Sequence, residues 1–300
     1  VIVTYNRKDL LRECLNAVLG QTRPPEHVLV VDNASTDGTP EMLQEEFSQV
    51  EVLRLPENLG GAGGFHEGMK RAYEMGFEWI WLMDDDGLPN ANTLEVLLEG
   101  ERHLFRGCLV LAKGKEEKLA FGVPMPGEHR LSRNLAEVLR AYPDGVIEGH
   151  LNPYNGCLLK REVVDKVGLP LKELFIWGDE NEYFLRSLSC GISVATYLKA
   201  LFWHPEDRQK AVCLEISRFR ITLPYSENPR RMYLIVRNSL FNLWRYRGRA
   251  KALVKAILYF LLFPKKGNVI LRAICDAIDL LRRNSRPCEN PRRIGTERSE

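Results

Sequence analysis

Short apolar runs alternate with amphipathic segments along the first 90 residues. Residues 1–5, 28–31 and 52–55 are rich in Val, Ile and Leu and predict three strands. Between the first two, apolar residues recur at the spacing of one helix face; they are Leu10, Leu11, Cys14, Leu15, Val18 and Leu19. A second helix is predicted with Thr39 as N-cap and Pro40 as its first residue. Strands that alternate with helices predict an α/β fold with a parallel sheet.

The fourth predicted strand ends in a cluster of acids. Residues 79–83 are apolar, and Asp84, Asp85 and Asp86 follow directly, before Gly87. In an open parallel sheet, ligands bind outside the carboxyl ends of the strands. Carboxylate oxygens suit Mg²⁺ or Mn²⁺, and a diphosphate would fill the remaining coordination positions. An acidic turn that bends at Gly87 is the better interpretation of this tetrapeptide taken alone.

A glycine-rich segment follows the third strand. The first strand is not followed by the Gly-x-Gly-x-x-Gly of a dinucleotide-binding domain, and the Gly-Lys-Ser/Thr of a P-loop is absent. Instead, Gly60, Gly61, Gly63 and Gly64 lead into a predicted helix that extends to about Met75. Backbone without side chains can approach a phosphate or a sugar closely, although a flexible turn explains the cluster equally well.

A second acidic pair opens a later helix. Asp179 and Glu180 precede Phe184, Leu185 and Leu188, which have helical spacing. Carboxylates at a helix N-terminus are favoured by about 0.3 to 1 kcal/mol, so capping is the better interpretation of the pair alone. Beside the first acidic cluster, a carboxylate here could take the proton from an attacking hydroxyl. A strand over residues 192–198 is predicted to follow.

Charge is distributed unevenly along the chain. Residues 228–300 hold 17 Lys and Arg against 5 Asp and Glu, whereas residues 1–227 hold 25 against 35. The basic C-terminal segment could bind nucleic acid, anionic lipid or a phosphorylated substrate. Amphipathic helices are predicted over residues 252–263 and 269–281. They lie either at a membrane surface or packed on the body of the protein. Residues 284–300 are predicted to form a disordered tail. The longest apolar run is too short to span a bilayer, which takes roughly 20 residues.

Four segments in order resemble the glycosyltransferases of family 2, which have the nucleotide-sugar-binding GT-A fold. They are Val-Thr-Tyr-Asn-Arg, Val-Asp-Asn-Ala-Ser-Thr-Asp-Gly, Asn-Leu-Gly-Gly-Ala-Gly-Gly-Phe and Asp-Asp-Asp-Gly. The resemblance is strongest to bacterial galactofuranosyltransferases, with rhamnosyltransferases near by, and covers about residues 1–205. It implies a nucleotide-sugar-binding half at residues 1–110 and an acceptor-binding half at 111–227. The basic, aromatic-rich pattern that follows predicts a basic helical region at 228–283.

The resemblance also implies roles for individual residues. The general base falls on Glu180 with Asp179 beside it, and the choice between these neighbours stays open. The implied ligands of Mn²⁺ or Mg²⁺ are Asp84, Asp86 and His204, although a lone His is more often structural. The implied contacts to the nucleotide sugar are Thr4, Asn6, Arg7, Asp32, Asn58, Gly60, Gly61, Gly63, Asp84 and Asp85. Trp177 and Trp203 could stack on acceptor sugars, but core packing is the better interpretation of both.

The expected activity is an inverting, metal-dependent transfer of galactofuranose. The donor would be UDP-galactofuranose, and the acceptor a hydroxyl of a cell-surface glycan carried on a polyprenyl diphosphate. Dispersed cysteines without a Cys-x-x-Cys pair fit a reducing cytosol, so we expect a cytoplasmic protein at the inner face of the membrane. One alternative is a rhamnosyltransferase that uses dTDP-rhamnose. Another is nucleic-acid binding through the basic tail, which the acidic body and the lack of a binding module oppose.

Overall fold

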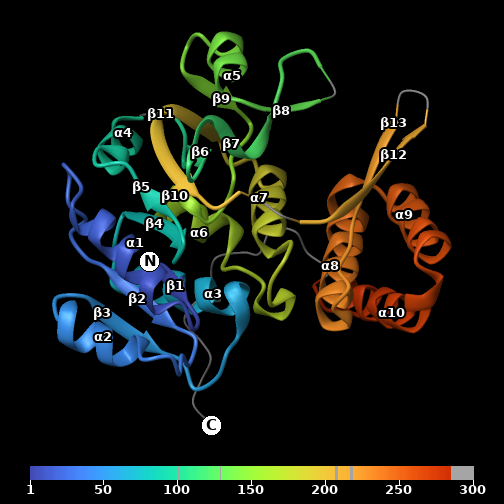
Figure 1. Cartoon of the computed structure of the whole chain (residues 1–300), viewed down its shortest axis with the longest axis horizontal. Coiled ribbons are helices and arrows are strands. Elements are labelled where there is room, and N and C mark those ends of the chain that lie inside the picture. Colours follow the sequence, from blue (N-terminus) through green and yellow to red (C-terminus); the bar gives the residue numbers. More distant parts are fainter. Residues whose placement is uncertain (101, 129, 207–208, 217–218, 285–300) are drawn as a thin grey trace.

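The computed structural model describes residues 1–284 except 101, 129, 207–208 and 217–218. Figure 1 shows two parts, an α/β body and a smaller lobe beside it that is built from the last helices and a hairpin. The predicted disordered tail, apart from Asn284, lies outside the described residues. Within the described part of the chain, every helix is too short or too polar to cross a bilayer.

The first half of the body is a parallel sheet with the strand order β3-β2-β1-β4. The pairing aligns Thr4 with Asp32 and Val3 with Asp84, so the carboxyl ends of these strands meet at one edge. The strands are β1 (Ile2–Thr4), β2 (Leu29–Asp32), β3 (Glu51–Arg54) and β4 (Trp79–Asp84), and the helices are α1 (Lys8–Leu19), α2 (Thr39–Glu46) and α3 (Gly60–Glu74). The predicted strands and parallel pairing are confirmed, whereas the N-cap of α2 is Gly38, with a φ of 86°, and not Thr39.

The second half extends the same sheet. β10 (Asn155–Lys160) is inserted antiparallel between β4 and β6 (Phe105–Ala112), and β11 (Val194–His204) runs parallel to β6. β11 corresponds to the strand predicted over residues 192–198, but it extends further along the chain and ends at His204. The other strands are β5 (Leu88–Pro89), β7 (Lys115–Pro124), β8 (Leu131–Asn134) and β9 (Val146–Glu148). The helices are α4 (Thr93–Glu99), α5 (Leu135–Ala141), α6 (Arg161–Val167) and α7 (Asp179–Ser189). The expected α/β class is confirmed.

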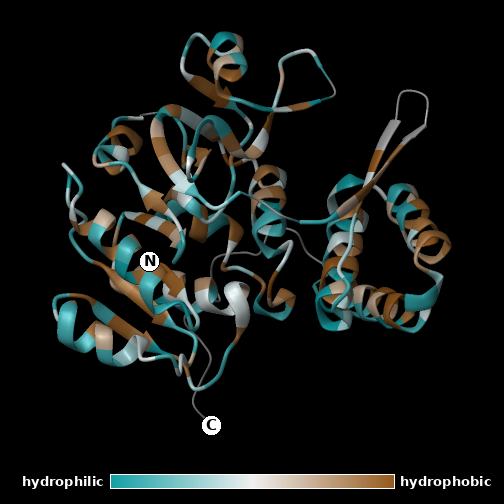
Figure 2. Cartoon of the chain, in the orientation of Figure 1, coloured by the Kyte–Doolittle hydropathy of each residue, from teal (hydrophilic) through white to brown (hydrophobic). Residues whose placement is uncertain are grey.

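Strand β4 is buried on both faces, which explains its continuous apolar sequence. Trp81 and Met83 pack in the cluster that contains the apolar face of α1, whereas Ile80 and Leu82 pack in the cluster that contains Phe65 of α3. Figure 2 shows apolar residues concentrated on the strands of the body. Helices on both faces therefore hold β4 in place, so the acids at its end have a rigid support.

The glycine-rich segment forms the start of α3 and not a loop before it. A Cβ on Gly60 would lie 2.1 Å from the carbonyl oxygen of Phe175, and a Cβ on Gly64 would lie 2.4 Å from Cγ1 of Val3. Of the two alternatives for the glycine cluster, the flexible turn is therefore excluded. The glycines allow the first turns of α3 to contact β1 and the segment before α7.

The lobe has its own apolar core. Leu223 of the hairpin, Met232, Tyr259 and Ile270 are buried together in it. The hairpin strands are β12 (Ala211–Ile216) and β13 (Phe219–Pro224); the helical segments are α8 (Pro229–Asn242), the π-turn η2 (Leu243–Arg247), α9 (Arg249–Leu262) and α10 (Gly267–Arg283). Both predicted amphipathic helices are confirmed as α9 and α10. Helix α8 lies inside the predicted basic helical region at 228–283, but its bounds were not predicted, because its buried polar residues interrupt the apolar pattern. The hairpin was not predicted.

Candidate active site

The two acidic clusters face one cleft of about 410 Å³. It lies at the carboxyl ends of β1 and β4, next to the N-termini of α3 and α7. Most of the residues singled out in the sequence line this cleft; they are Thr4, Arg7, Asn58, Gly60, Gly61, Asp84, Asp85, Asp86, Trp177, Asp179, Glu180 and His204. Five elements that are far apart in the sequence, β1, β4, β11, α3 and α7, thus place polar groups around one space.

The first cluster is only partly neutralised. Thr4 Oγ1 donates a hydrogen bond to Asp85 Oδ2 at 2.7 Å, and Arg7 lies 3.1 Å from Asp85 Oδ1 and 2.9 Å from Asp86 Oδ2. Burial raises the pKa of Asp85 to about 6 despite Arg7. Burial and the neighbouring acids raise the pKa of Asp84 well above its usual value. The cluster therefore favours a cation or protons beside it.

His204 brings an imidazole to the same cluster from the end of β11. Its Nδ1 lies 2.6 Å from the carbonyl oxygen of Pro205, so Nδ1 carries a proton and Nε2 faces Asp86 Oδ1 at 3.2 Å. Burial opposes the charge on His204, but Asp86 outweighs burial and raises the pKa of the imidazole. Asp86 Oδ1 is buried and makes no hydrogen bond, since the contact with His204 lacks hydrogen-bond geometry.

The second cluster combines one buried and one partly exposed carboxyl group. Asp179 is 4% exposed, and burial first, then Glu180, raises its pKa well above the usual value. Glu180 Oε2 accepts a hydrogen bond from the backbone N–H of Gly178 at 2.8 Å. The pair lies in the first turn of α7, whose N-cap is Gly178, and also lines the cleft, so a helix-stabilising role and a role in the cleft are compatible.

Four predicted site residues do not line the cleft. Asn6 Oδ1 accepts from the N–H of Thr36 at 2.7 Å, and Trp203 Nε1 donates to Asn90 Oδ1 at 2.7 Å. A Cβ on Gly63 would lie 2.3 Å from Cβ of Leu59. Asp32 is buried, and its Oδ2 makes no hydrogen bond, with Arg54 Nε at 3.7 Å. These four are therefore not among the residues that line the cleft, and their binding roles stay predictions.

The cleft also contains residues that sequence reasoning missed. Tyr154, which stacks on Phe65 at 3.8 Å between ring centroids, lines it together with Asn155 and Phe175. Tyr154 and Phe175 have φ angles of 60° and 66°, and Asn155 Oδ1 is buried without a hydrogen bond. The Asn-Gly pair at the start of β10 was the available signal, but the sequence pattern was interpreted only as the start of a strand.

No three His, Cys, Asp or Glu side chains in the part of the chain that the structure describes are already arranged to hold a metal ion. The donor set at the first cluster nevertheless has the chemistry of such a site. Asp86 offers an oxygen without a hydrogen bond, and His204 offers Nε2 while its other nitrogen is held by a carbonyl. A backbone partner on the second ring nitrogen is typical of His ligands.

Comparisons with known proteins point to one family of enzymes. The model of the family described as "Glycosyl transferase family 2" matches residues 1–103. The galactofuranosyltransferase GlfT1 of Mycolicibacterium smegmatis is 34% identical over 210 residues, which cover 68% of this chain and 70% of that protein.

Solved structures with the same fold are more distant in sequence. The structure of Staphylococcus aureus TarS, residues 1–349, in complex with UDP has a TM-score of 0.53 at 14% identity and covers 88% of this chain and 71% of that one. The mannosyltransferase PcManGT from Pyrobaculum calidifontis, in complex with GDP-Man and Mn²⁺, has a TM-score of 0.51 at 19% identity and covers 95% and 78%. At these identities the likeness is one of fold.

Proposed function

The chain belongs to glycosyltransferase family 2, and from this premise we propose that it transfers galactofuranose from UDP-galactofuranose to a hydroxyl of a glycan. The observation that carries the proposal is the meeting of two carboxylate clusters in one cleft. One is suited to a nucleotide diphosphate with its cation, and the other to an attacking hydroxyl. The similarity to a galactofuranosyltransferase supports the choice of donor sugar.

We assign the nucleotide sugar to the side of the cleft formed by β1 and β4. Arg7 bridges Asp85 and Asp86 and is half-exposed, so its guanidinium can also contact a phosphate oxygen. Asn58 and the first turn of α3 face the same space, and a helix N-terminus attracts anions. In this assignment, Asp85 binds a sugar or ribose hydroxyl, which suits a carboxylate already held by Thr4.

Asp84, Asp86 and His204 are the proposed ligands of Mn²⁺ or Mg²⁺. One imidazole among oxygen ligands favours Mn²⁺ somewhat. When bound, the ion supplies positive charge to the leaving diphosphate. Before it binds, Arg7 and His204 hold Asp86 in place, so little reorganisation of the carboxylate is needed.

Glu180 is the proposed general base. It accepts the proton of the acceptor hydroxyl while that oxygen attacks the anomeric carbon, and the bond from this carbon to the diphosphate oxygen breaks with the electron pair leaving on UDP. Attack from the face opposite UDP inverts the configuration. Burial and Glu180 raise the pKa of Asp179 well above its usual value, and the partly exposed Glu180 is the better placed of the two to contact an acceptor hydroxyl.

We further propose that the lobe contacts an anionic membrane where a polyprenyl-diphosphate-linked acceptor would reside. Large apolar residues are exposed on α9 and α10; they are Leu253, Val254, Ile257, Phe260, Leu261, Leu262, Leu271 and Ile278. Figure 2 shows these helices with mixed apolar and polar surfaces. Because the lobe is strongly basic, the contact is proposed for the negatively charged inner face of the cell membrane.

The experiment that tests the donor is calorimetric binding of UDP and dTDP, each with and without Mn²⁺, followed by transfer assays with the corresponding sugars. We expect tighter, Mn²⁺-dependent binding of UDP and transfer from UDP-galactofuranose. Preference for dTDP and transfer from dTDP-rhamnose would replace the proposal with a rhamnosyltransferase. Binding of neither nucleotide would contradict the assigned site.

A further inference from the structure

The segment that leads into the proposed base has an unusual backbone. Residues 174–178 connect a short 3-10 turn to α7, and Phe175, Trp177 and Gly178 in it have φ angles of 66°, 63° and 101°. Non-glycine residues rarely adopt this left-handed conformation, and they keep it only where surrounding contacts impose it. We call residues 174–178 the base loop, because its conformation determines where Glu180 lies.

Helix α8 of the lobe supplies these contacts. Asn238, which is 0% exposed, directs its Nδ2 at the carbonyl oxygens of Leu174, Ile176 and Trp177 at 2.9, 3.0 and 2.9 Å. Arg237 Nε donates to Asn238 Oδ1 at 2.9 Å, which fixes the orientation of the amide. One buried side chain thus binds three of the five carbonyls of the base loop.

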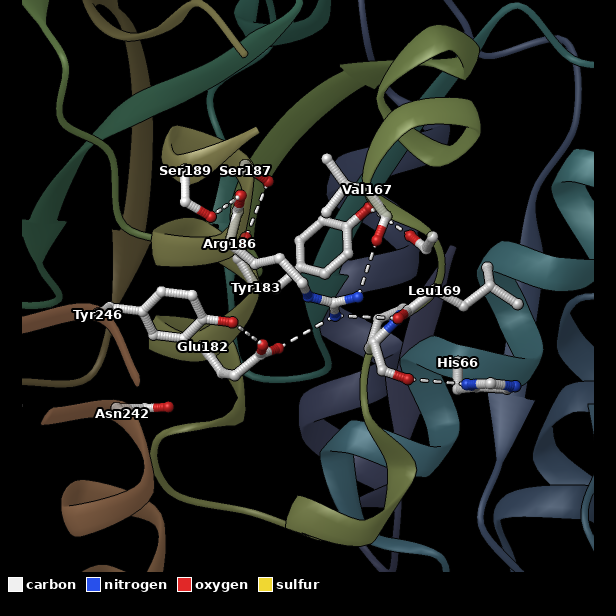
Figure 3. Close-up of polar contacts among 12 residues, drawn as sticks. His66, Val167, Leu169, Glu182, Tyr183, Arg186, Ser187, Ser189, Asn242 and Tyr246 are labelled. Carbon is white, nitrogen blue, oxygen red and sulfur yellow. Dashed lines mark hydrogen bonds and ion pairs between the residues drawn. The ribbon is translucent and has the colours of Figure 1, made fainter. Parts of the chain in front are cut away.

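Neighbouring residues of the lobe extend the same arrangement. Asn242 Nδ2 donates to the carbonyl oxygen of Gly178 at 2.8 Å. Tyr246 of η2 donates to Glu182 Oε1 at 2.6 Å, and Arg186 binds the other oxygen of Glu182 at 3.0 Å. Figure 3 shows Tyr246 and Asn242 on the side of the lobe, next to Glu182 on the first turns of α7. The lobe therefore holds both the base loop and the helix that carries Glu180.

On its other side, the base loop contacts the proposed nucleotide-sugar region. The carbonyl oxygen of Phe175 accepts from the N–H of Ala62 at 3.0 Å, and Gly60 leaves room for that carbonyl. The loop is thus fixed between α3 of the body and α8 of the lobe. A change in α8 would move the start of α7 relative to the sugar without altering β1 or β4.

We infer that Asn238 is a positioning residue for the transfer reaction. It lies outside the cleft lining and touches no reacting group, but it holds the base loop in the conformation that directs Glu180 into the cleft. The lobe is therefore part of the catalytic apparatus in addition to its proposed role at the membrane. This inference rests on the proposed function for its effect on turnover, although the restraint itself is a property of the fold.

The test compares Asn238→Ala with Asn268→Ala, which changes an exposed asparagine on α10 of the same lobe. We expect Asn238→Ala to lower kcat about 100-fold, because small misplacements of a catalytic group cost that much. The affinity for UDP should change less than about twofold, since β1 and β4 are untouched. Hydrogen exchange should become faster for the amides of residues 175–180 and stay unchanged in β4. The control should resemble the wild type in all three measurements.

The exchange measurement needs neither donor nor acceptor, so it tests the restraint even if the wild type fails to use UDP-galactofuranose and the proposed function is wrong. Unchanged exchange in the base loop, or unchanged kcat in an active enzyme, would overturn the inference. So would losses of kcat, UDP affinity and thermal stability in parallel. If Asn238→Ala does not fold, Asn242→Ala removes a single carbonyl contact, and the same selective loss, smaller in size, is expected.

Discussion

Two acidic clusters meet in one cleft, and they differ in how their charge is balanced. The three acids at the end of β4 have Arg7 and His204 against them, and Asp86 has a lowered pKa as a result, because these cations outweigh its burial. At the start of α7, Asp179 has a pKa raised by burial and by its neighbour Glu180. The first arrangement suits exchange of ions and phosphates, whereas the second suits proton transfer.

The largest expected effect is that of Glu180→Gln at the second cluster. The amide keeps the size of the side chain but cannot accept the acceptor's proton, so kcat should fall about 10²- to 10⁴-fold. Steady-state transfer assays at saturating donor measure this. Glu173→Gln, an exposed acid before the base loop, is the matched control and should retain full activity. Wild-type turnover in Glu180→Gln would show that another group is the base.

Asp86→Asn tests the first cluster. Loss of one carboxylate oxygen from the proposed ligand set should raise the Mn²⁺ concentration for half-maximal activity by roughly 100-fold, since even outer-shell partners contribute about 10- to 100-fold. Activity titrated against Mn²⁺ gives this value. Asp9→Asn, an exposed acid on α1, is the control. An unaltered Mn²⁺ titration in Asp86→Asn would remove this residue from the ligand set.

Asp179→Asn should change how the stability of the protein depends on pH. A carboxyl pKa that is raised in the folded state makes that state bind more protons than the unfolded chain, so the free energy of unfolding falls as pH rises through the window above about pH 4. The amide variant lacks this penalty and should melt about 2 to 4 °C higher at pH 8, with the difference vanishing near pH 4. Thermal melts at several pH values measure it, with Asp144→Asn as control. A lower melting temperature at pH 8 would contradict the assigned charge state.

The smallest effect on turnover is expected from changes to the exposed apolar residues of α9. Ile257→Glu with Leu261→Glu on α9 should reduce binding to vesicles that contain phosphatidylglycerol about tenfold or more, because each buried aliphatic side chain contributes about 1.5 to 3 kcal/mol. Turnover of a water-soluble acceptor should be unchanged. Leu139→Glu, at an exposed leucine of α5 in the body, serves as control. Equal vesicle binding by both variants would exclude α9 as the membrane contact.

The sequence predicted those parts of the fold that depend on apolar periodicity and on strand ends. The parallel strands, the position of Asp84 at the end of β4, and Asp179 at the start of α7 follow from local patterns, and all three are confirmed. The galactofuranosyltransferase resemblance agrees with the similarity found. These features are determined by residues that are close to one another in the sequence.

Features that depend on contacts between distant segments were not predicted. The glycines of α3 are required by Phe175 and Val3, which lie 115 and 61 positions from Gly60 and Gly64 along the sequence, and a single sequence does not reveal such pairs. The contact between α8 and the body was not predicted, because Arg237, Asn238 and Asn242 are polar and yet buried against backbone carbonyls of the body. Sequence patterns treat such residues as exposed.

The most direct test of the division between the two clusters is calorimetric titration of UDP into Asp86→Asn and Glu180→Gln, with and without Mn²⁺. We expect Asp86→Asn to lose the Mn²⁺-dependent part of the affinity, and Glu180→Gln to bind UDP as the wild type does. Equal weakening in both variants, or weakening in Glu180→Gln alone, would contradict it.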